Sequence, residues 1–359
     1  MALGLVIATI CLGVVIAILA VDIMGIFSSK NHFEVDGRTV VITGGSQGMG
    51  RGLARLLASK GANVVIVARN QQKLDDALKY IAAAAKNPQI QRFHAISADV
   101  ARYEENARMF AEVARWNDDS PPDVVWANAG VAHPSLFIDT PLDIQRSQMD
   151  INYWSTAYLA HLTLRAWLQR NDAKLNAVSA KAVRPRHFVM TSSVACLVGI
   201  AGYAPYAPPK AALRSLADQL HSELNLYNGY RRANPSAGPL ADVKIHCVVP
   251  GTITSPGYER EKEIKHPVTT VLEDGDPKQS EDEVARGAVR GLEKGGFIVA
   301  TNMLGNAMRV SMMGGSPRNN LILDTLFSWV TSIAWLFIGP DMEGKVFDYG
   351  KKNKIDLPQ

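Results

Sequence analysis

Seven short runs of β-branched and apolar residues recur between residues 36 and 301, separated by longer segments with helical spacing of apolar side chains. The runs are continuously apolar, as in Thr-Val-Val-Ile-Thr at 39–43, and do not alternate with polar residues. Strands buried on both faces have this composition, because helices cover both sides of a parallel sheet. The pattern therefore predicts an α/β fold built on a doubly wound, seven-stranded parallel sheet.

The expected elements follow this alternation along the chain. The predicted strands are 39–43, 63–68, 92–96, 123–127, 187–191, 244–249 and 296–300, and the predicted helices are 50–59, 71–85, 104–116, 151–169, 211–227 and 281–293. Two polar connections, 171–186 and 228–242, are longer than typical crossover loops, so we expect both to bulge on the surface.

Charge and cysteine content exclude several function classes. A net charge of +4 over 359 residues, with no basic run of five, argues against a nucleic-acid partner. The three cysteines, Cys11, Cys196 and Cys247, are odd in number, widely spaced and contain no CxxC pair. Neither a disulfide framework nor a metal site is therefore expected, and a reducing compartment fits this usage.

The first 27 residues are predicted to form a transmembrane anchor. Asp22 is the one charged side chain within 1–27, and roughly 20 apolar residues suffice to cross a bilayer. A cleaved signal peptide is the alternative, but it carries basic residues before its apolar stretch, whereas Lys30 and Arg38 follow this one. Basic residues on the far side place the rest of the chain in the cytosol.

A second apolar stretch, 321–338, contains two tryptophans and two phenylalanines with one acid, Asp324, and it ends at Gly339-Pro340. Its length is borderline for a span, and a single crossing would carry a basic tail at 341–359 into the lumen. We therefore expect 302–340 to be a membrane-associated segment with an in-plane or re-entrant helix. The alternative is a buried helix of the globular domain.

A glycine-rich loop follows the first predicted strand and opens a helix, at 43–50. Glycines permit a tight turn and close backbone approach, while the helix N-terminus offers N–H groups to a pyrophosphate. Glycines also serve turns alone, but the strand–loop–helix setting favours a Rossmann-type dinucleotide site. The candidate contacts are Gly44, Ser46, Gln47, Gly48 and Gly50.

The end of the second strand discriminates between the two nicotinamide dinucleotides. An acid there would bond the ribose 2′-OH of NAD, but the chain has Arg69, with Lys73 four residues later. Two cations suit a 2′-phosphate, so NADPH is the expected cofactor. The alternative is that Arg69 and Lys73 only form an ordinary solvated helix start. Asp99-Val100 could bond the adenine, and Asn128 could line the nicotinamide side, although either could equally be a cap or a turn.

The order of these motifs resembles that of the short-chain dehydrogenases/reductases. The residues that carry the resemblance, over about 36–300, are the loop at 43–50, Asn128-Ala-Gly130, Ser193, Tyr206-x-x-x-Lys210 and Pro250-Gly251. The resemblance implies an oxidoreductase that binds its cofactor partly through Pro250.

Tyr206 and Lys210 lie one helical turn apart, so they share a face. A ketone reduced by hydride needs an acid for its oxygen, and a phenol with a pKa near 10 releases its proton poorly at neutral pH. The Lys210 ammonium would stabilise the tyrosinate and reach the ribose hydroxyls. Ser193 or Ser192 could bond the substrate oxygen. The family pattern favours Ser193 and implies that Asn152 holds a water beside the lysine.

Two departures from the family pattern stand out. Pro208 and Pro209 are tolerated only in the first turn of a helix, so this helix should begin close to Tyr206. Cys196 stands where glycine is frequent, and we interpret it as a small buried residue.

Within that superfamily the chain is most similar to the 3-ketodihydrosphingosine reductases, on Gly44-Gly-Ser-Gln-Gly48, the stretch 191–206 and the segment 250–258. The resemblance implies NADPH-dependent reduction of a long-chain amino ketone by an endoplasmic-reticulum membrane enzyme facing the cytosol. A lipophilic substrate fits apolar segments at both ends of the chain. A 3-ketoacyl-CoA, steroid or retinoid substrate and a non-catalytic NADP-binding scaffold remain alternatives, and a homo-oligomer is possible.

Residues 252–280 leave the C-terminal edge of the sixth strand, the side on which such sheets bind ligands, and are expected to form a lid over the substrate. One of Glu259, Glu261 and Glu263 is a candidate for meeting the substrate ammonium. The alternative is that all three form solvated pairs with the neighbouring lysines and arginine.

Overall fold

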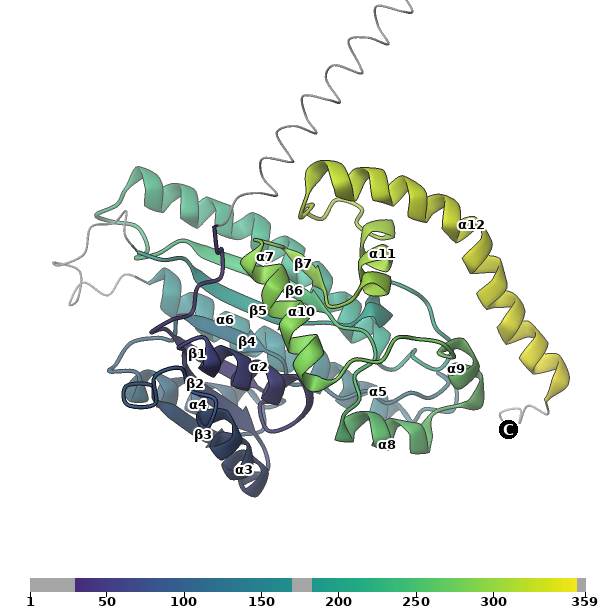
Figure 1. Cartoon of the computed structure of the whole chain (residues 1–359), viewed down its shortest axis with the longest axis horizontal. Helices are drawn as coiled ribbons and strands as arrows, with labels where there is room; N and C mark the ends of the chain where they lie inside the picture. The colour runs from purple at the N-terminus through teal and green to yellow at the C-terminus, as the bar shows by residue number, and fades with distance from the viewer. Residues whose placement is uncertain (1–29, 170–182, 354–359) are drawn as a thin grey trace, which may run out of the picture.

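The computed structural model describes residues 30–169 and 183–353. All seven expected strands form a single parallel sheet in the order β3-β2-β1-β4-β5-β6-β7 (Figure 1). The strands are β1 (Thr39–Thr43), β2 (Asn63–Ala68), β3 (Phe93–Ser97), β4 (Val124–Ala127), β5 (Arg186–Thr191), β6 (Val243–Val249) and β7 (Ile298–Ala300). The predicted α/β fold is confirmed, while the expected anchor at 1–27 lies outside the described residues.

Two helical layers cover the sheet. Alternate strand residues point to opposite faces, so Val41 belongs to one core and Val40 and Ile42 to the other. One face is covered by α4 (Tyr103–Trp116), α6 (Ser155–Leu168) and α7 (Ala207–Ala233), and the other by α2 (Gly48–Ser59), α3 (Gln71–Ala82) and α10 (Glu281–Glu293). This arrangement is why the strands are apolar throughout.

The helix predicted over 151–169 is different in the structure. α5 (Leu142–Met149) runs through one π-helical turn, η1 (Asp150–Trp154), into α6. A π turn inserts one extra residue into the helical repeat, and such turns are frequent at functional sites. Asn152 lies inside it and is fully buried.

The prediction that 228–242 is wholly a surface connection is wrong for its first part, because α7 continues to Ala233. The Asn228 side chain donates to the carbonyl of Val243 and accepts from its N–H, at 3.0 and 2.9 Å. Arg231 bonds the Asp242 carboxylate at 3.2 Å. Polar side chains that suggest a loop therefore hold the end of α7 against the start of β6. Of the other predicted connection, residues 170–182 lie outside the described part.

Beyond β7 the chain forms α11 (Met303–Ser311) and then α12 (Leu321–Lys352). The predicted end at Gly339-Pro340 is wrong, since α12 continues through Pro340 and takes up part of the expected basic tail. A proline removes one backbone hydrogen bond and bends a helix, and α12 is visibly curved in Figure 1.

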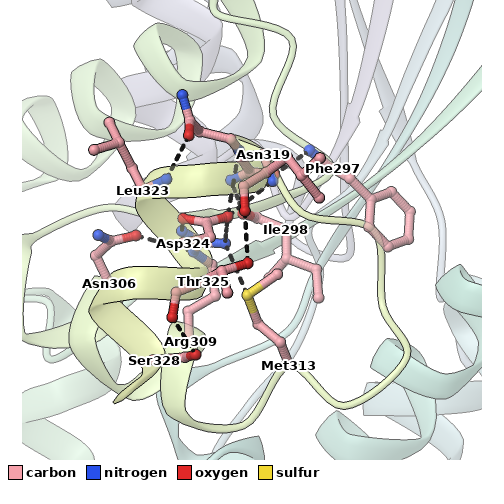
Figure 2. A network of polar contacts seen from close by, with 12 residues as sticks. Phe297, Ile298, Asn306, Arg309, Met313, Asn319, Leu323, Asp324, Thr325 and Ser328 are labelled. Atoms are coloured by element: carbon pink, nitrogen blue, oxygen red, sulfur yellow. Dashed lines mark hydrogen bonds and ion pairs between the residues drawn. The ribbon is translucent and has the colours of Figure 1, made fainter. Parts of the chain in front are cut away.

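α12 contacts the rest of the domain near both of its ends. Near its start, Arg309 makes a buried, two-pronged ion pair with Asp324 at 2.9 and 2.5 Å (Figure 2). Asn319 accepts from the N–H of Phe297 and donates to the carbonyl of Ile298, which joins the turn before α12 to β7. Near its other end, Tyr349 meets the ring of His266, which caps α9 (Pro267–Leu272).

Between these attachments α12 presents apolar side chains to solvent. Its most apolar 18-residue window has a mean hydropathy of 1.8 and is only 6% buried, so it could cross a membrane by length and composition. Large exposed side chains along it include Trp329, Val330, Ile333, Leu336 and Phe337. The alternative of a buried core helix is therefore excluded for α12.

Candidate active site

The glycine-rich loop is shaped for close approach. Gly44 and Gly48 have φ values of +69° and +59°, which side chains disfavour. A Cβ on Gly50 would lie 2.2 Å from the Gly44 carbonyl oxygen and 2.7 Å from Asn128 Nδ2. Gln47 is the N-cap of α2 but makes no side-chain capping bond, and Ser46 is half-buried beside it. The loop therefore presents backbone at the N-terminus of α2, as a pyrophosphate site requires.

Glu281, from the start of α10, also reaches this helix terminus. Its carboxylate accepts from the Gly48 N–H at 2.8 Å and from Arg51 Nε at 2.9 Å. Arg51 is thereby neutralised, and one N–H of the α2 terminus is already satisfied. No sequence pattern indicates this contact, because 233 residues separate Glu281 from Gly48.

Arg69 and Lys73 stand at the end of β2 and the start of α3, as predicted. Both side chains are exposed, and within the described part of the chain neither takes part in a hydrogen bond or ion pair through its charged group. Asn70 caps α3 by accepting from the Lys73 N–H at 2.9 Å. After β3, Asp99 accepts from the Ala101 N–H at 3.2 Å, and Val100 is buried.

Asn128 joins the C-terminal ends of three strands. Its side chain donates to the Thr43 carbonyl at 3.2 Å and accepts from the Thr191 hydroxyl at 3.2 Å. The Thr43 hydroxyl in turn accepts from the backbone N–H groups of Asn128 and Ala129, both at 3.0 Å. Asn128, which was predicted to line the nicotinamide side, therefore holds the ends of these strands together.

Lys210 is buried under this edge, with 2% of its surface exposed. Its ammonium donates to the Thr191 carbonyl at 2.9 Å and lies 5.6 Å from the centroid of the Tyr206 ring. A Cβ on Gly130 would lie 2.7 Å from Asn152 Oδ1 and 2.9 Å from Lys210 Nζ, so those two groups converge there. Asn152 is held by the backbone of Val131 at 3.1 and 2.9 Å.

The two candidate serines have different surroundings. Ser192 is buried, and its hydroxyl donates to the Lys210 carbonyl at 2.6 Å, so it supports α7. Ser193 opens onto a cavity of about 160 Å³ that Tyr206 and Pro250 also line. The structure therefore places Ser193, and not Ser192, beside the phenol.

The walls of this cavity come from the segment 252–280 and from the loops after β4, β5 and β6. They include Ala132, Ser193, Ile200, Tyr203, Tyr206, Thr252, Tyr258, Glu261, Glu273 and Asp276. The segment 252–280 forms α8 (Pro256–Ile264) and α9, and its two ends are paired through Ile253 and Gln279. The acids and the tyrosine of this segment line the same small, partly open cavity as Ser193 and Tyr206.

Burial sets the protonation of the central groups. It raises the pKa of Tyr206, with the charge of Glu261 adding to the rise and a hydrogen bond with Ser193 opposing it. Burial also lowers the pKa of Lys210 to about 8. The expected lowering of the phenol pKa by the Lys210 ammonium is not found in the protein alone. Tyr206 is therefore firmly protonated, the form in which it can donate.

Tyr203 and Glu273 were not singled out from the sequence. The Tyr203 hydroxyl donates to Glu273 at 2.6 Å, and the same carboxylate binds Lys265 at 2.5 Å. These bonds hold α9 and the end of α8 against the loop before α7. Tyr203 lies three residues from Tyr206, but its partner is 70 residues away, so spacing offered no signal.

The two sequence departures are accommodated. α7 begins at Ala207 with Tyr206 as its N-cap, so both prolines fall in the first turn as predicted. Cys196 lies in a short 3₁₀ turn, Val194–Cys196, and is only partly buried, less than expected.

Comparison with known proteins agrees with this geometry. The family model described as short chain dehydrogenase matches residues 38–264. The 3-ketodihydrosphingosine reductase ksrA of Aspergillus fumigatus is 48% identical over 92% of this chain and 89% of its own length. The 3-ketodihydrosphingosine reductase gsl-3 of Neurospora crassa is 44% identical over 92% and 87%.

Solved structures share the fold. A short-chain dehydrogenase/reductase from Burkholderia phymatum, in complex with NAD, superposes with a TM-score of 0.60 at 18% identity. The match covers 78% of this chain and 94% of that one.

The crowding at Gly50 leads to a prediction for the Gly50→Ala variant. The added Cβ must displace the Gly44 carbonyl, and overpacking of this kind costs about 1–3 kcal/mol. We expect dinucleotide affinity, measured by titration calorimetry, to fall by about 10- to 100-fold. Gly199→Ala, where no atom lies within 4 Å of the new Cβ, is the matched control. An unchanged affinity in Gly50→Ala would contradict the assignment of the loop.

Proposed function

Because the chain belongs to the short-chain dehydrogenase/reductase family, we propose that it reduces the 3-keto group of 3-ketodihydrosphingosine, a long-chain amino ketone, to dihydrosphingosine with NADPH. The observation that carries the proposal is the cavity of about 160 Å³ that Ser193 and Tyr206 share, with the Lys210 ammonium buried next to it. The names of the relatives from Aspergillus and Neurospora support the choice of substrate.

The residues at the C-terminal edge of the sheet fit a dinucleotide. Gly44, Gly48 and Gly50 leave room for a pyrophosphate at the N-terminus of α2. Exposed Arg69 and Lys73 would meet a 2′-phosphate, and no acid takes the place that favours NAD. When bound, the reduced dinucleotide supplies the hydride that the carbonyl carbon accepts.

Two side chains, Ser193 and Tyr206, act on the carbonyl oxygen of the substrate. Ser193 donates a hydrogen bond that orients it, and Tyr206 gives it a proton as negative charge develops there. An alkoxide is a stronger base than a phenolate, so the raised pKa of Tyr206 keeps the acid loaded without preventing the transfer.

Lys210 acts behind the tyrosine. Its ammonium lies 5.6 Å from the centroid of the Tyr206 ring, and its pKa of about 8 leaves it mostly charged at neutral pH. We assign it the stabilisation of the tyrosinate that remains after proton transfer. Asn152, locked in the π turn, holds its amide beside the ammonium and would position a water that returns the proton.

The apolar face of α12 supports a site at the membrane. Thirty-two helical residues extend about 48 Å, and both ends of α12 contact the globular part, so the helix runs along the domain and does not project from it. We infer an in-plane helix on the cytosolic leaflet of the endoplasmic reticulum, with 1–27 as anchor and 252–280 as substrate lid.

The direct test offers NADPH and a long-chain 3-keto sphingoid base to the detergent-solubilised chain and follows nicotinamide absorbance. We expect turnover by the wild type and, in Tyr206→Phe, a fall in kcat of about 100- to 10,000-fold because the proton donor is lost. NADPH affinity should stay within about twofold, since the ring is retained.

A 3-ketoacyl-CoA and a 3-ketosteroid offered in parallel serve as substrate controls. Turnover of either, without turnover of the sphingoid base, would contradict the proposed substrate. Full activity of Tyr206→Phe would contradict the mechanism.

A second prediction concerns the choice of dinucleotide. Arg69→Glu places an acid where it repels a 2′-phosphate and can accept from a 2′-OH, so the kcat/KM for NADPH should fall by about 10- to 100-fold. The kcat/KM for NADH should not fall. Lys79→Glu, the same charge reversal at the exposed far end of α3, is the control. Equal losses for both dinucleotides would count against a 2′-phosphate site.

A third prediction tests the membrane face. In vesicle flotation of residues 30–359, replacing Trp329 and Phe337 by serine should lower the partition coefficient by about tenfold or more, because each exposes large apolar area. Ile90→Ser, equally exposed but remote from α12, should bind as the parent does. Undiminished binding of the double variant would rule out α12 as the docking surface.

A further inference from the structure

The proposed substrate carries an ammonium on the carbon next to its carbonyl, so a group that recognises the amine must lie close to the catalytic phenol. We propose that Glu261 in the lid is this group, and that it sets the preference of the enzyme for amino ketones over simple long-chain ketones. The inference rests on the proposed function and deepens it.

Position separates Glu261 from the other acids of its helix. Glu261 is half-buried and lines the cavity with Ser193 and Tyr206, whereas Glu259 and Glu263 are exposed and do not line it. Glu259 is also engaged with Lys262 at 2.9 and 3.0 Å. One helix therefore offers three carboxylates, and only one of them faces the reacting groups.

Glu261 differs from the other acids of the cavity in its hydrogen-bond and ion-pair partners. Glu273 is committed to the Tyr203 hydroxyl and to Lys265. Asp276 lines the same cavity, but its electrostatic neighbours are Glu273 and Lys265. The charge of Glu261 is the one that acts on both Tyr203 and Tyr206. Within 30–169 and 183–353, its carboxylate makes no hydrogen bond or ion pair.

The surroundings of Glu261 disfavour its charged form. Burial raises the pKa of Glu261 to about 7, and the attraction of Lys265 and Arg260 does not offset the burial together with the repulsion from Glu273. A half-buried carboxylate without a bonded cation is costly, and an incoming ammonium would compensate it through a charge-assisted hydrogen bond. Lys265, the lysine whose charge acts on Glu261, is already paired with Glu273. The ammonium of the substrate would therefore supply the cation that Glu261 lacks.

The test compares two substrates in two proteins. The full-length chain in detergent, with NADPH, is given the 3-keto sphingoid base and a ketone of equal length that lacks the amino group. For Glu261→Gln we expect the kcat/KM of the amino ketone to fall by about 10- to 100-fold. For the ketone without the amine, kcat/KM should change by less than about twofold, which a merely structural role would not produce.

Glu259→Gln makes the same substitution two residues earlier on an exposed position, and Asp276→Asn removes a second acid of the cavity, whose electrostatic neighbours are Glu273 and Lys265. Both variants should keep the preference for the amino ketone. NADPH affinity and the thermal unfolding midpoint report whether Glu261→Gln is folded.

A second measurement needs no variant. A saturated long-chain primary amine should inhibit the wild type at least about tenfold more strongly than its N-acetyl derivative, because acetylation removes the charge.

Different failures have different meanings. If the wild type reduces neither ketone, the proposed function itself is wrong. If it reduces both and Glu261→Gln keeps the preference for the amine, or loses both activities equally, the proposed function stands and Glu261 is not the amine-binding group. Equal inhibition by the amine and its N-acetyl derivative would overturn the inference in the same way.

Discussion

The hydrogen bonds that join the C-terminal ends of β1, β4 and β5 are the constraint on which the site depends. Thr43, Asn128 and Thr191 bond one another through side chains and backbone. The carbonyl of Thr191 then receives the ammonium of Lys210. Because parallel strands end at the same edge, four residues that are far apart in the chain become one rigid floor. The glycine-rich loop and the phenol are both positioned against it, so catalysis and cofactor binding share a single support.

The segment 252–280 connects these strand ends to the apolar helix α12. Glu273 joins Tyr203, just before α7, to Lys265 at the end of α8, and His266 contacts Tyr349 near the end of α12. At its other end, α12 is joined to β7 through Asn319 and to α11 through Arg309 and Asp324. A buried ion pair of this kind contributes geometry more than net stability. The consequence is that the apolar face of α12 has a defined orientation relative to the mouth of the site.

Sequence patterns predicted the strands to within two residues and located the glycine-rich loop from its setting between a strand and a helix. The resemblance to the short-chain dehydrogenases/reductases singled out the Tyr206–Lys210 pair. The patterns failed where polar residues had distant partners. Asn228 and Arg231 look like loop residues until Val243 and Asp242 are brought beside them. Pro340 looked like a helix end, yet α12 passes through it. The phenol pKa was misjudged because burial, a tertiary property, raises it and the charge of Glu261 adds to the rise.

The sequence by itself determined that the chain makes a parallel sheet covered on both faces, that a helix begins at the glycine-rich loop, and that a tyrosine and a lysine share one helical face. These follow from backbone sterics and from the repeats of 2 and 3.6 residues, which neighbours in the chain encode. Only the tertiary structure decided that Glu281 reaches the N-terminus of α2, and that Glu261 is the one glutamate of α8 that lines the cavity beside the phenol. Those choices arise from contacts across as many as 233 residues, which no local repeat can carry.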